Sequence, residues 1–132
     1  MIELSCGGAM NPVLVVDDQH DILSFIEWEL KPTGIECSQA DNTNKAIELL
    51  KEKQLSCIFL DILLDDTSSE EVLKFLKSEE NNLNRDIPVV IMSGFINQEF
   101  IDRNVDKVYK ILEKPFNTGE IVEIVNSLKD VA

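Results

Sequence analysis

Carboxylate, hydroxyl and amine side chains stand directly after short apolar runs in this sequence. A carboxylate held near apolar surroundings costs free energy unless a partner or a cation offsets its charge. The placement of these groups therefore points to chemistry at the ends of buried strands. The groups concerned are Asp17 and Asp18, Asp61, Ser93 and Lys114.

Phosphoryl transfer beside a magnesium ion is the chemistry that this set of groups would support. Three carboxylates close together repel one another, and a hard cation with oxygen ligands relieves that repulsion. Asp17, Asp18 and Asp61 are therefore candidate Mg²⁺ ligands. Asp61 is also a candidate carboxylate nucleophile. Lys114 would balance charge on the phosphoryl oxygens, and Ser93 would donate a hydrogen bond to them.

Alternating strands and helices are needed to bring these distant groups together. The run Cys57–Leu60 is apolar throughout, which is typical of a strand buried on both faces. The expected strands cover residues 13–16, 35–40, 57–61, 87–92 and 108–112. Helices are expected to follow them. Asp21 can cap the first helix, Asn42-Thr43 starts the second, and Ser68 and Glu71 match a capping box for the third. A short fourth helix is expected around Ile96 to Arg103, and Asn117 or Thr118 is expected to cap the last.

Five strand–helix alternations with short connections predict a doubly wound α/β fold, with a parallel sheet and helices on both faces. In such sheets, ligands bind beyond the carboxyl ends of the strands. The chemical groups named above should therefore meet at one edge. The length of 132 residues suits one domain, which we place at residues 12–132 after a tail at residues 1–11.

Composition narrows the classes of partner. The formal net charge of −13 argues against binding to nucleic acid or to anionic membrane surfaces. No apolar run reaches the ~18 residues of a membrane-spanning helix, and no secretory signal is evident. Cys6, Cys37 and Cys57 show no metal-ligand spacing. We therefore expect a cytoplasmic protein with reduced thiols, without a disulfide scaffold or zinc site.

Four motifs resemble the response-regulator receiver domain of two-component signalling. They are Val13-Leu14-Val15-Val16-Asp17-Asp18, Leu60-Asp61-Ile62, Ile91-Met92-Ser93-Gly94 and Lys114-Pro115-Phe116. Each motif alone is weak, but their order and spacing together are specific. The resemblance extends over about residues 12 to 130.

The resemblance implies a flavodoxin-like (βα)5 sheet of strand order 2-1-3-4-5. It also implies that a histidine kinase or a histidine phosphotransfer protein supplies the phosphoryl group. By position, Asp61 resembles the phosphoacceptor, and Asp17 and Asp18 resemble the Mg²⁺-binding acids. The backbone carbonyl of Leu63 resembles the third protein ligand, and Ser93 and Lys114 resemble the residues that contact the phosphoryl group.

The expected role is that of a stand-alone receiver that catalyses only its own phosphorylation and dephosphorylation. Because no output domain follows in the sequence, output is expected through contact with a partner protein. The surface expected to make that contact is formed by the fourth helix, the fifth strand and the fifth helix.

Departures from the family pattern occur near the site. Leu64-Asp65 and Ser68-Ser69 stand where many receivers have Met-Pro and Asp-Gly. Ile111 stands three residues before Lys114, where the family often has Tyr or Phe, and Tyr109 lies on the same face of the strand.

Two other functions are compatible with the motifs. The chain could be a receiver-fold interaction module that does not switch, with Ile111 marking the lost response. It could also be a Mg²⁺-dependent phosphohydrolase with an aspartyl-phosphate intermediate. Such an enzyme would use a second Asp two residues after Asp61 as a general acid, and Leu63 is there. His20 is expected to be a first-turn helix residue rather than a base, and Trp28 a packing or surface residue of the same helix.

Overall fold

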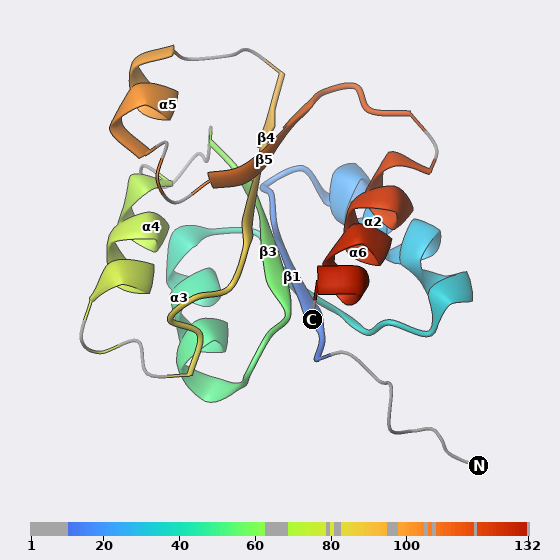
Figure 1. The fold of residues 1–132 in the computed structure, drawn as a ribbon, viewed down its shortest axis with the longest axis horizontal. Helices are drawn as coiled ribbons and strands as arrows, with labels where there is room; N and C mark the ends of the chain where they lie inside the picture. The colour runs from blue at the N-terminus through green and yellow to red at the C-terminus, as the bar shows by residue number, and fades with distance from the viewer. Residues whose placement is uncertain are drawn as a thin grey trace.

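A five-stranded parallel sheet lies between two layers of helices in the computed structural model (Figure 1). The structure describes residues 11–62, 69–78, 80, 83–94, 98–104, 106, 108–117 and 119–131. The strand order is β2-β1-β3-β4-β5, and every pairing is parallel. This order confirms the predicted flavodoxin-like fold, including the edge position of β2.

The elements alternate along the chain as the sequence predicts. The strands are β1 (Val13–Val16), β2 (Cys37–Ala40), β3 (Cys57–Asp61), β4 (Val89–Ser93) and β5 (Val108–Glu113). The helices are α2 (His20–Leu30), α3 (Thr43–Glu52), α4 (Glu70–Lys77), α5 (Gln98–Asn104) and α6 (Glu120–Val131), and a 3₁₀ turn, η1 (Lys31–Thr33), follows α2. Pro32 lies in this turn, and Gly34 ends it with a φ of 78°, a conformation that glycine adopts without steric cost.

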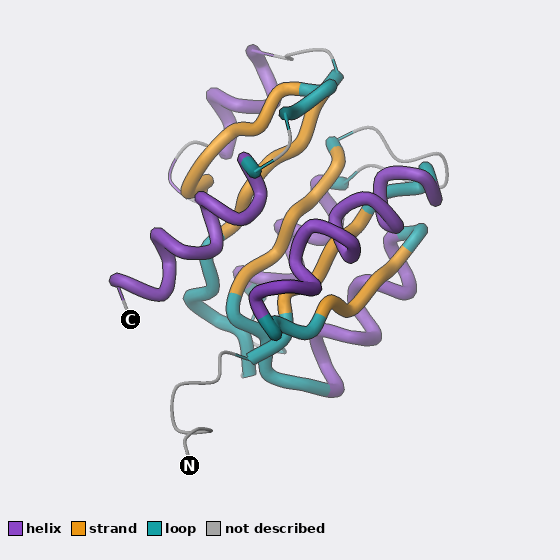
Figure 2. The backbone as a smooth tube through the Cα atoms, turned by 90° about the vertical axis from the view of Figure 1, so that its right-hand side faces the viewer, coloured by secondary structure: helices purple, strands orange, loops and turns teal. Residues whose placement is uncertain are grey.

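Two hydrophobic clusters fill the two faces of the sheet. Alternate residues of a strand point to opposite faces, so Val13 and Val15 pack with α2 and α6, whereas Leu14 and Val16 pack with α3, α4 and α5. Figures 1 and 2 show these two helical layers from different sides. Because both faces are covered, the inner strands are apolar without interruption, which explains the runs in the sequence.

Strand register places the predicted site residues at the carboxyl edge of the sheet. Val16 pairs with Leu60, so Asp17 and Asp61 follow at matching levels of β1 and β3. Asp61 in turn pairs with Met92, the residue before Ser93. The amide of Lys114 donates to the Ser93 carbonyl at 2.7 Å, which brings the end of β5 to the same edge.

Helix starts differ from the sequence expectation at three places. The N-cap of α4 is Ser69, so the predicted capping box at Ser68 is one residue out of register, and the Ser69 hydroxyl donates instead to the Ile62 carbonyl at 3.1 Å. Asp21 lies in the first turn of α2, where Gln19 is the N-cap. These positions depend on the loops that connect helices to strands, which hydrophobic periodicity does not register.

The third difference concerns α6, which begins at Glu120 rather than directly after Asn117 or Thr118. Gly119 precedes the helix with a φ of 95°. Its amide donates to a Glu29 carboxylate oxygen at 2.5 Å, so a side chain of α2 satisfies a backbone donor at this helix start. Asn42, by contrast, caps α3 as predicted, because its side chain accepts from the Lys45 amide at 2.8 Å.

Asn84 is a buried polar residue in the segment between α4 and β4. Its side-chain oxygen accepts from the Leu55 amide at 2.8 Å. Its side-chain nitrogen donates to the carbonyls of Leu50 and Lys53, at 2.8 and 2.9 Å. This one side chain therefore ties the segment before β4 to the end of α3 and the start of β3.

Within the described part of the chain, the cysteine thiols form no disulfide. Cys57 is buried in β3, as expected of a small apolar residue, and burial raises the pKa of its thiol to about 12. Burial likewise raises the pKa of the Cys37 thiol to about 11. Cys6 lies outside the described residues. Among the helices that are described, none combines the length and the apolar character needed to cross a bilayer.

Candidate functional site

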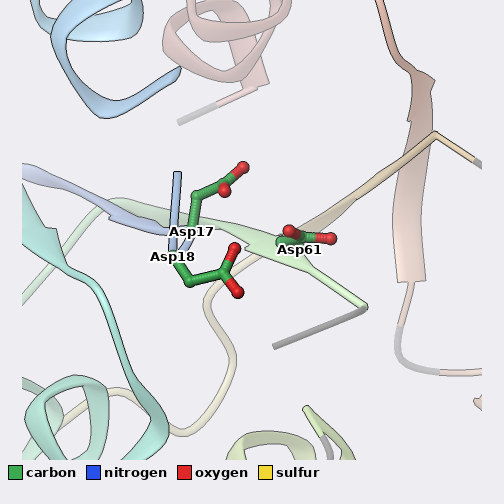
Figure 3. Close-up of side chains that lie close together, drawn as sticks. All are labelled: Asp17, Asp18 and Asp61. Carbon is green, nitrogen blue, oxygen red and sulfur yellow. The ribbon is translucent and has the colours of Figure 1, made fainter. Parts of the chain in front are cut away.

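Three carboxylates gather where β1 and β3 end (Figure 3). One oxygen from each of Asp17, Asp18 and Asp61 lies within 4.8 Å of the others. Asp17 and Asp61 are buried, and Asp18 is half-buried. The sequence predicted that these three acids would meet, and the structure brings them together.

The ammonium group of Lys114 lies against two of these acids. Its Nζ atom is 2.7 Å from Asp17 Oδ2 and 3.3 Å from Asp61 Oδ2, and the lysine side chain is only 13% exposed. Charge-assisted hydrogen bonds of this kind are stronger than neutral ones, and they offset part of the cost of burying the carboxylates. Lys114, which directly follows the edge strand β5, thus links that strand to the acidic cluster.

Asp17 is held at both carboxylate oxygens. Oδ1 accepts a hydrogen bond from the Gln19 amide at 2.9 Å, and Oδ2 accepts from Lys114. The short loop after β1 therefore folds so that its Gln19 amide contacts the Asp17 side chain. A cation that binds here meets a carboxylate whose orientation is already set by the protein.

Ser93 stands at the end of β4, the strand beside β3, and is buried. Its carbonyl accepts the Lys114 amide, so the backbone of β4 fixes the start of the segment that carries the lysine. The sheet therefore brings Ser93 and Lys114 to the same carboxyl edge as Asp61.

Contacts with α2 hold the segment that follows Lys114. The Lys114–Pro115 peptide bond is cis. The ring of Phe116 packs against the ring of Phe25, with 5.8 Å between their centroids. This packing and the hydrogen bond from the Gly119 amide to Glu29 hold the segment between Lys114 and α6 against α2.

The donor set fits a divalent cation. Carboxylate oxygens are the ligands that Mg²⁺ prefers, and a single ammonium group stands against three clustered carboxylates in this part of the structure. The predicted ligand Leu63 lies outside the described residues, as do Leu64, Asp65, Asp66 and Ser68 of the same loop. Within the described residues, the carboxylates and the lysine therefore define the site.

Gln19 is a site residue that sequence reasoning missed. Its side-chain oxygen accepts from Lys114 Nζ at 3.3 Å. Its place directly after the Asp17-Asp18 pair was the only signal in the sequence.

His20, the first residue of α2 as predicted, is exposed and pairs with Asp41 at 3.0 Å. Hydrogen bonds from His20 and Asn42 lower the pKa of Asp41.

Strand β5 also carries two large side chains that are exposed to solvent. Tyr109 is 45% exposed, and Ile111 is 37% exposed. The Tyr109 and Ser127 hydroxyls lie 3.2 Å apart, which connects β5 to α6. Trp28 is 72% exposed on α2, so it is a surface residue.

The fold and the site together define a class of protein. It is a doubly wound α/β domain whose parallel sheet presents an acidic pocket and a lysine at its carboxyl edge. The chain matches the family model of the response regulator receiver domain over residues 13–126, and it therefore belongs to that family.

Relatives and solved structures agree with this assignment. An NtrX-like response regulator of Rickettsia bellii is 31% identical over 125 residues, which are 90% of this chain and 25% of that protein. The phosphate regulon transcriptional regulatory protein PhoB of Pseudomonas aeruginosa is 30% identical over 111 residues, covering 83% of this chain and 48% of PhoB. The chain thus spans a quarter to about a half of the length of these relatives.

Among solved structures, the response regulator TrrA of Thermotoga maritima, in complex with Mg²⁺ and beryllofluoride, has the same fold. Its TM-score to this chain is 0.75 at 24% sequence identity, and the alignment covers 90% of this chain and 99% of TrrA. At this level of identity, the similarity establishes the fold alone.

Proposed function

We propose that this receiver domain accepts a phosphoryl group on Asp61 in a Mg²⁺-dependent reaction. The observation that carries the proposal is the convergence of Asp17 and Asp18, from the end of β1, and of Lys114, from the end of β5, on Asp61 at the end of β3. A buried carboxylate with an ammonium at 3.3 Å and two further acids beside it has the parts that phosphoryl transfer requires, namely positioning and charge balance.

The proposed donor is a phosphohistidine on a histidine kinase or a histidine phosphotransfer protein. An Asp61 carboxylate oxygen attacks phosphorus, forming an O–P bond while the P–N bond breaks. The electron pair of that bond returns to the ring nitrogen, and with a proton on its second nitrogen the histidine leaves as neutral imidazole. The Lys114 ammonium balances charge on a phosphoryl oxygen, and the Ser93 hydroxyl donates to another.

Asp17, Asp18, Asp61 and the backbone carbonyl of Leu63 are the proposed protein ligands of Mg²⁺. When bound, the ion supplies positive charge beside the phosphoryl oxygens. The structure of TrrA with Mg²⁺ and beryllofluoride supports this proposal by fold similarity. The chemistry is then limited to the domain's own phosphorylation and to hydrolysis of the resulting acyl phosphate, which restores Asp61.

The proposed output surface comprises α5, β5 and α6. Tyr109 and Ile111 are exposed on β5, and a cleft of about 550 Å³ lies between β5 and α6. Phosphorylation at the sheet edge would bias the population of two arrangements of this surface, one of which a partner protein binds.

One observation favours a second candidate function, a receiver-fold module that binds its partner without switching. The exposed side chain three residues before Lys114 is aliphatic Ile111, and Tyr109 is engaged with Ser127 of α6. The two functions differ in one measurable property. A switching receiver changes its affinity for its partner when Asp61 is phosphorylated, whereas a non-switching module does not.

Intact-mass measurement with acetyl phosphate tests the proposal. The wild-type chain should gain one phosphoryl group with Mg²⁺ present and should gain none with a chelator. Asp61→Asn should gain none under either condition, and Asp86→Asn, which changes an acid outside the site, should behave as wild type. A phosphoryl gain by Asp61→Asn equal to that of the wild type would contradict the assignment of the acceptor.

A further inference from the structure

The ammonium group of Lys114 has three hydrogen-bond donors and three acceptors within reach. Two acceptors are carboxylate oxygens, Asp17 Oδ2 at 2.7 Å and Asp61 Oδ2 at 3.3 Å. The third is the neutral side-chain oxygen of Gln19, at 3.3 Å. Since an ammonium group carries three N–H bonds, these contacts can account for all of them.

Gln19 reaches the lysine from a fixed backbone position. Its amide donates to Asp17 Oδ1 at 2.9 Å, and its carbonyl accepts from the amides of Ile22 and Leu23 in the first turn of α2, at 3.0 and 3.3 Å. Its own side chain is exposed, so Gln19 lies on the solvent side of the site. The lysine is therefore held between buried acids and this exposed amide.

The three acceptors respond differently to the chemistry proposed above. A divalent cation and an incoming phosphoryl group would compete with Lys114 for the oxygens of Asp17 and Asp61. The oxygen of Gln19 is neutral and belongs to neither group. A lysine side chain loses rotamer entropy when it is held in one orientation. An acceptor that remains in place during the reaction would reduce that loss at the critical step.

We propose that Gln19 is a positioning residue that keeps Lys114 directed at the phosphoryl group on its way to and from Asp61. This inference rests on the proposed function. It assigns Gln19 no contact with phosphorus, because its effect passes through the ammonium group of Lys114. The same lysine balances charge during phosphoryl gain and during hydrolysis, so Gln19 should influence both rates.

A double-mutant cycle with Gln19→Met and Lys114→Met tests the proposal. Methionine has nearly the length of glutamine but lacks the acceptor. Gln19→Met should slow both phosphoryl gain from acetyl phosphate and phosphoryl loss by roughly three- to tenfold, which is the scale of one weak hydrogen bond to a charged group. The maximum rate should change, and the half-saturating concentration of acetyl phosphate should not.

In the Lys114→Met background, Gln19→Met should have no further effect, since the residue through which Gln19 acts is gone. Gln54→Met, on an exposed segment before β3, is the matched control and should leave both rates unchanged. If the lysine variant is phosphorylated too slowly to measure, the same four proteins can be compared at equilibrium. Their Mg²⁺-dependent affinity for beryllofluoride, measured by ¹⁹F NMR, then takes the place of the rates.

The outcomes separate this inference from the function on which it rests. A wild-type chain that neither gains a phosphoryl group nor binds beryllofluoride would overturn the proposed function itself. A wild-type chain that is phosphorylated, with Gln19→Met unchanged in rates and affinity, would overturn only the positioning role. Equal effects of Gln19→Met with and without Lys114 would also overturn it, because they would show that Gln19 acts by another route.

Discussion

At the scale of residues, the site is a balance between three carboxylates and one ammonium group. Lys114 contacts Asp17 and Asp61 directly, and its side chain is largely shielded from water. Removing one partner of such a buried pair leaves charge without compensation, which costs far more than a surface ion pair contributes. We therefore expect the lysine to have two separable effects, one on stability and one on the proposed phosphoryl transfer.

Replacing Lys114 with methionine should expose both effects. In the absence of metal, Lys114→Met should lower the free energy of unfolding by about 3 kcal/mol, because two buried acids lose their counter-charge. Phosphoryl gain should slow by roughly 10²-fold, as when one charge-stabilising group is removed from a site. Urea unfolding and intact-mass kinetics measure the two quantities. A stability equal to that of the wild type in chelator would contradict this view of the cluster.

Asn84 provides a second prediction at this scale, away from the site. Hydrogen bonds of its side chain satisfy backbone groups of Leu50, Lys53 and Leu55. Asn84→Ala should lower the free energy of unfolding by about 2–3 kcal/mol, because buried polar groups lose their partners. Urea unfolding measures the loss, and Asn44→Ala, on the exposed side of α3, is the control. A loss below that of the control would show that water replaces these bonds.

At the scale of elements, an ion pair joins α4 and α5, the helices that follow β3 and β4. Glu70, the first residue of α4, receives two hydrogen bonds from Arg103 near the end of α5, at 2.8 and 3.1 Å. These contacts lower the pKa of Glu70 below its ordinary value of 4.5. The pair thereby connects α4 to a helix of the proposed output surface.

The pH dependence of this ion pair follows from the direction of the shift. A carboxyl group whose pKa is lowered by folding stabilises the fold fully above its unfolded value and loses that contribution as the pH falls through the folded value. Glu70→Gln should therefore be less stable than the wild type at pH 7, and the difference should shrink below about pH 4.5.

Urea unfolding between pH 7 and pH 3 checks this prediction. Glu99→Gln is the control, because Glu99 is 90% exposed and lies 4.0 Å from the same arginine. A stability difference between Glu70→Gln and the wild type that stays constant over this range would contradict the assigned role of the ion pair.

Much of the fold and most of the site followed from the sequence, for a common reason. Strands buried on both faces appear as continuous apolar runs, and the carboxyl ends of parallel strands share one edge. Asp17, Asp18, Asp61 and Lys114 could therefore be placed together although up to 97 positions separate them.

The residues that the sequence did not reveal act through partners on other elements. Gln19 contacts a lysine 95 positions away, Glu29 an amide 90 positions away, and Asn84 an amide 29 positions away. No local sequence pattern predicts such contacts, because each depends on how the helices and the sheet pack in the folded domain. Ser69 as the N-cap of α4 was missed for a similar reason, since its hydroxyl donates to the carbonyl of Ile62, the residue after β3.

At the scale of the whole molecule, the site belongs to the framework of the sheet, so binding there should stabilise the entire domain. Mg²⁺ at about 100 times its dissociation constant should raise the free energy of unfolding by about 2.7 kcal/mol. Asp18→Asn should lose most of this gain, while Asp102→Asn, which changes an exposed residue of α5, should retain it. Thermal unfolding with Mg²⁺ and with chelator makes the comparison. A gain that Asp18→Asn retains in full would place the metal elsewhere.

The position of the phosphoryl group itself can be measured chemically, and this measurement decides whether Asp61 is the acceptor. Borohydride reduces an aspartyl phosphate to homoserine, which peptide mass spectrometry assigns to one position. After treatment with acetyl phosphate and Mg²⁺, we predict homoserine at position 61 and at no other aspartate. Homoserine at another position, with Asp61 recovered unchanged from a phosphorylated chain, would contradict the proposed function.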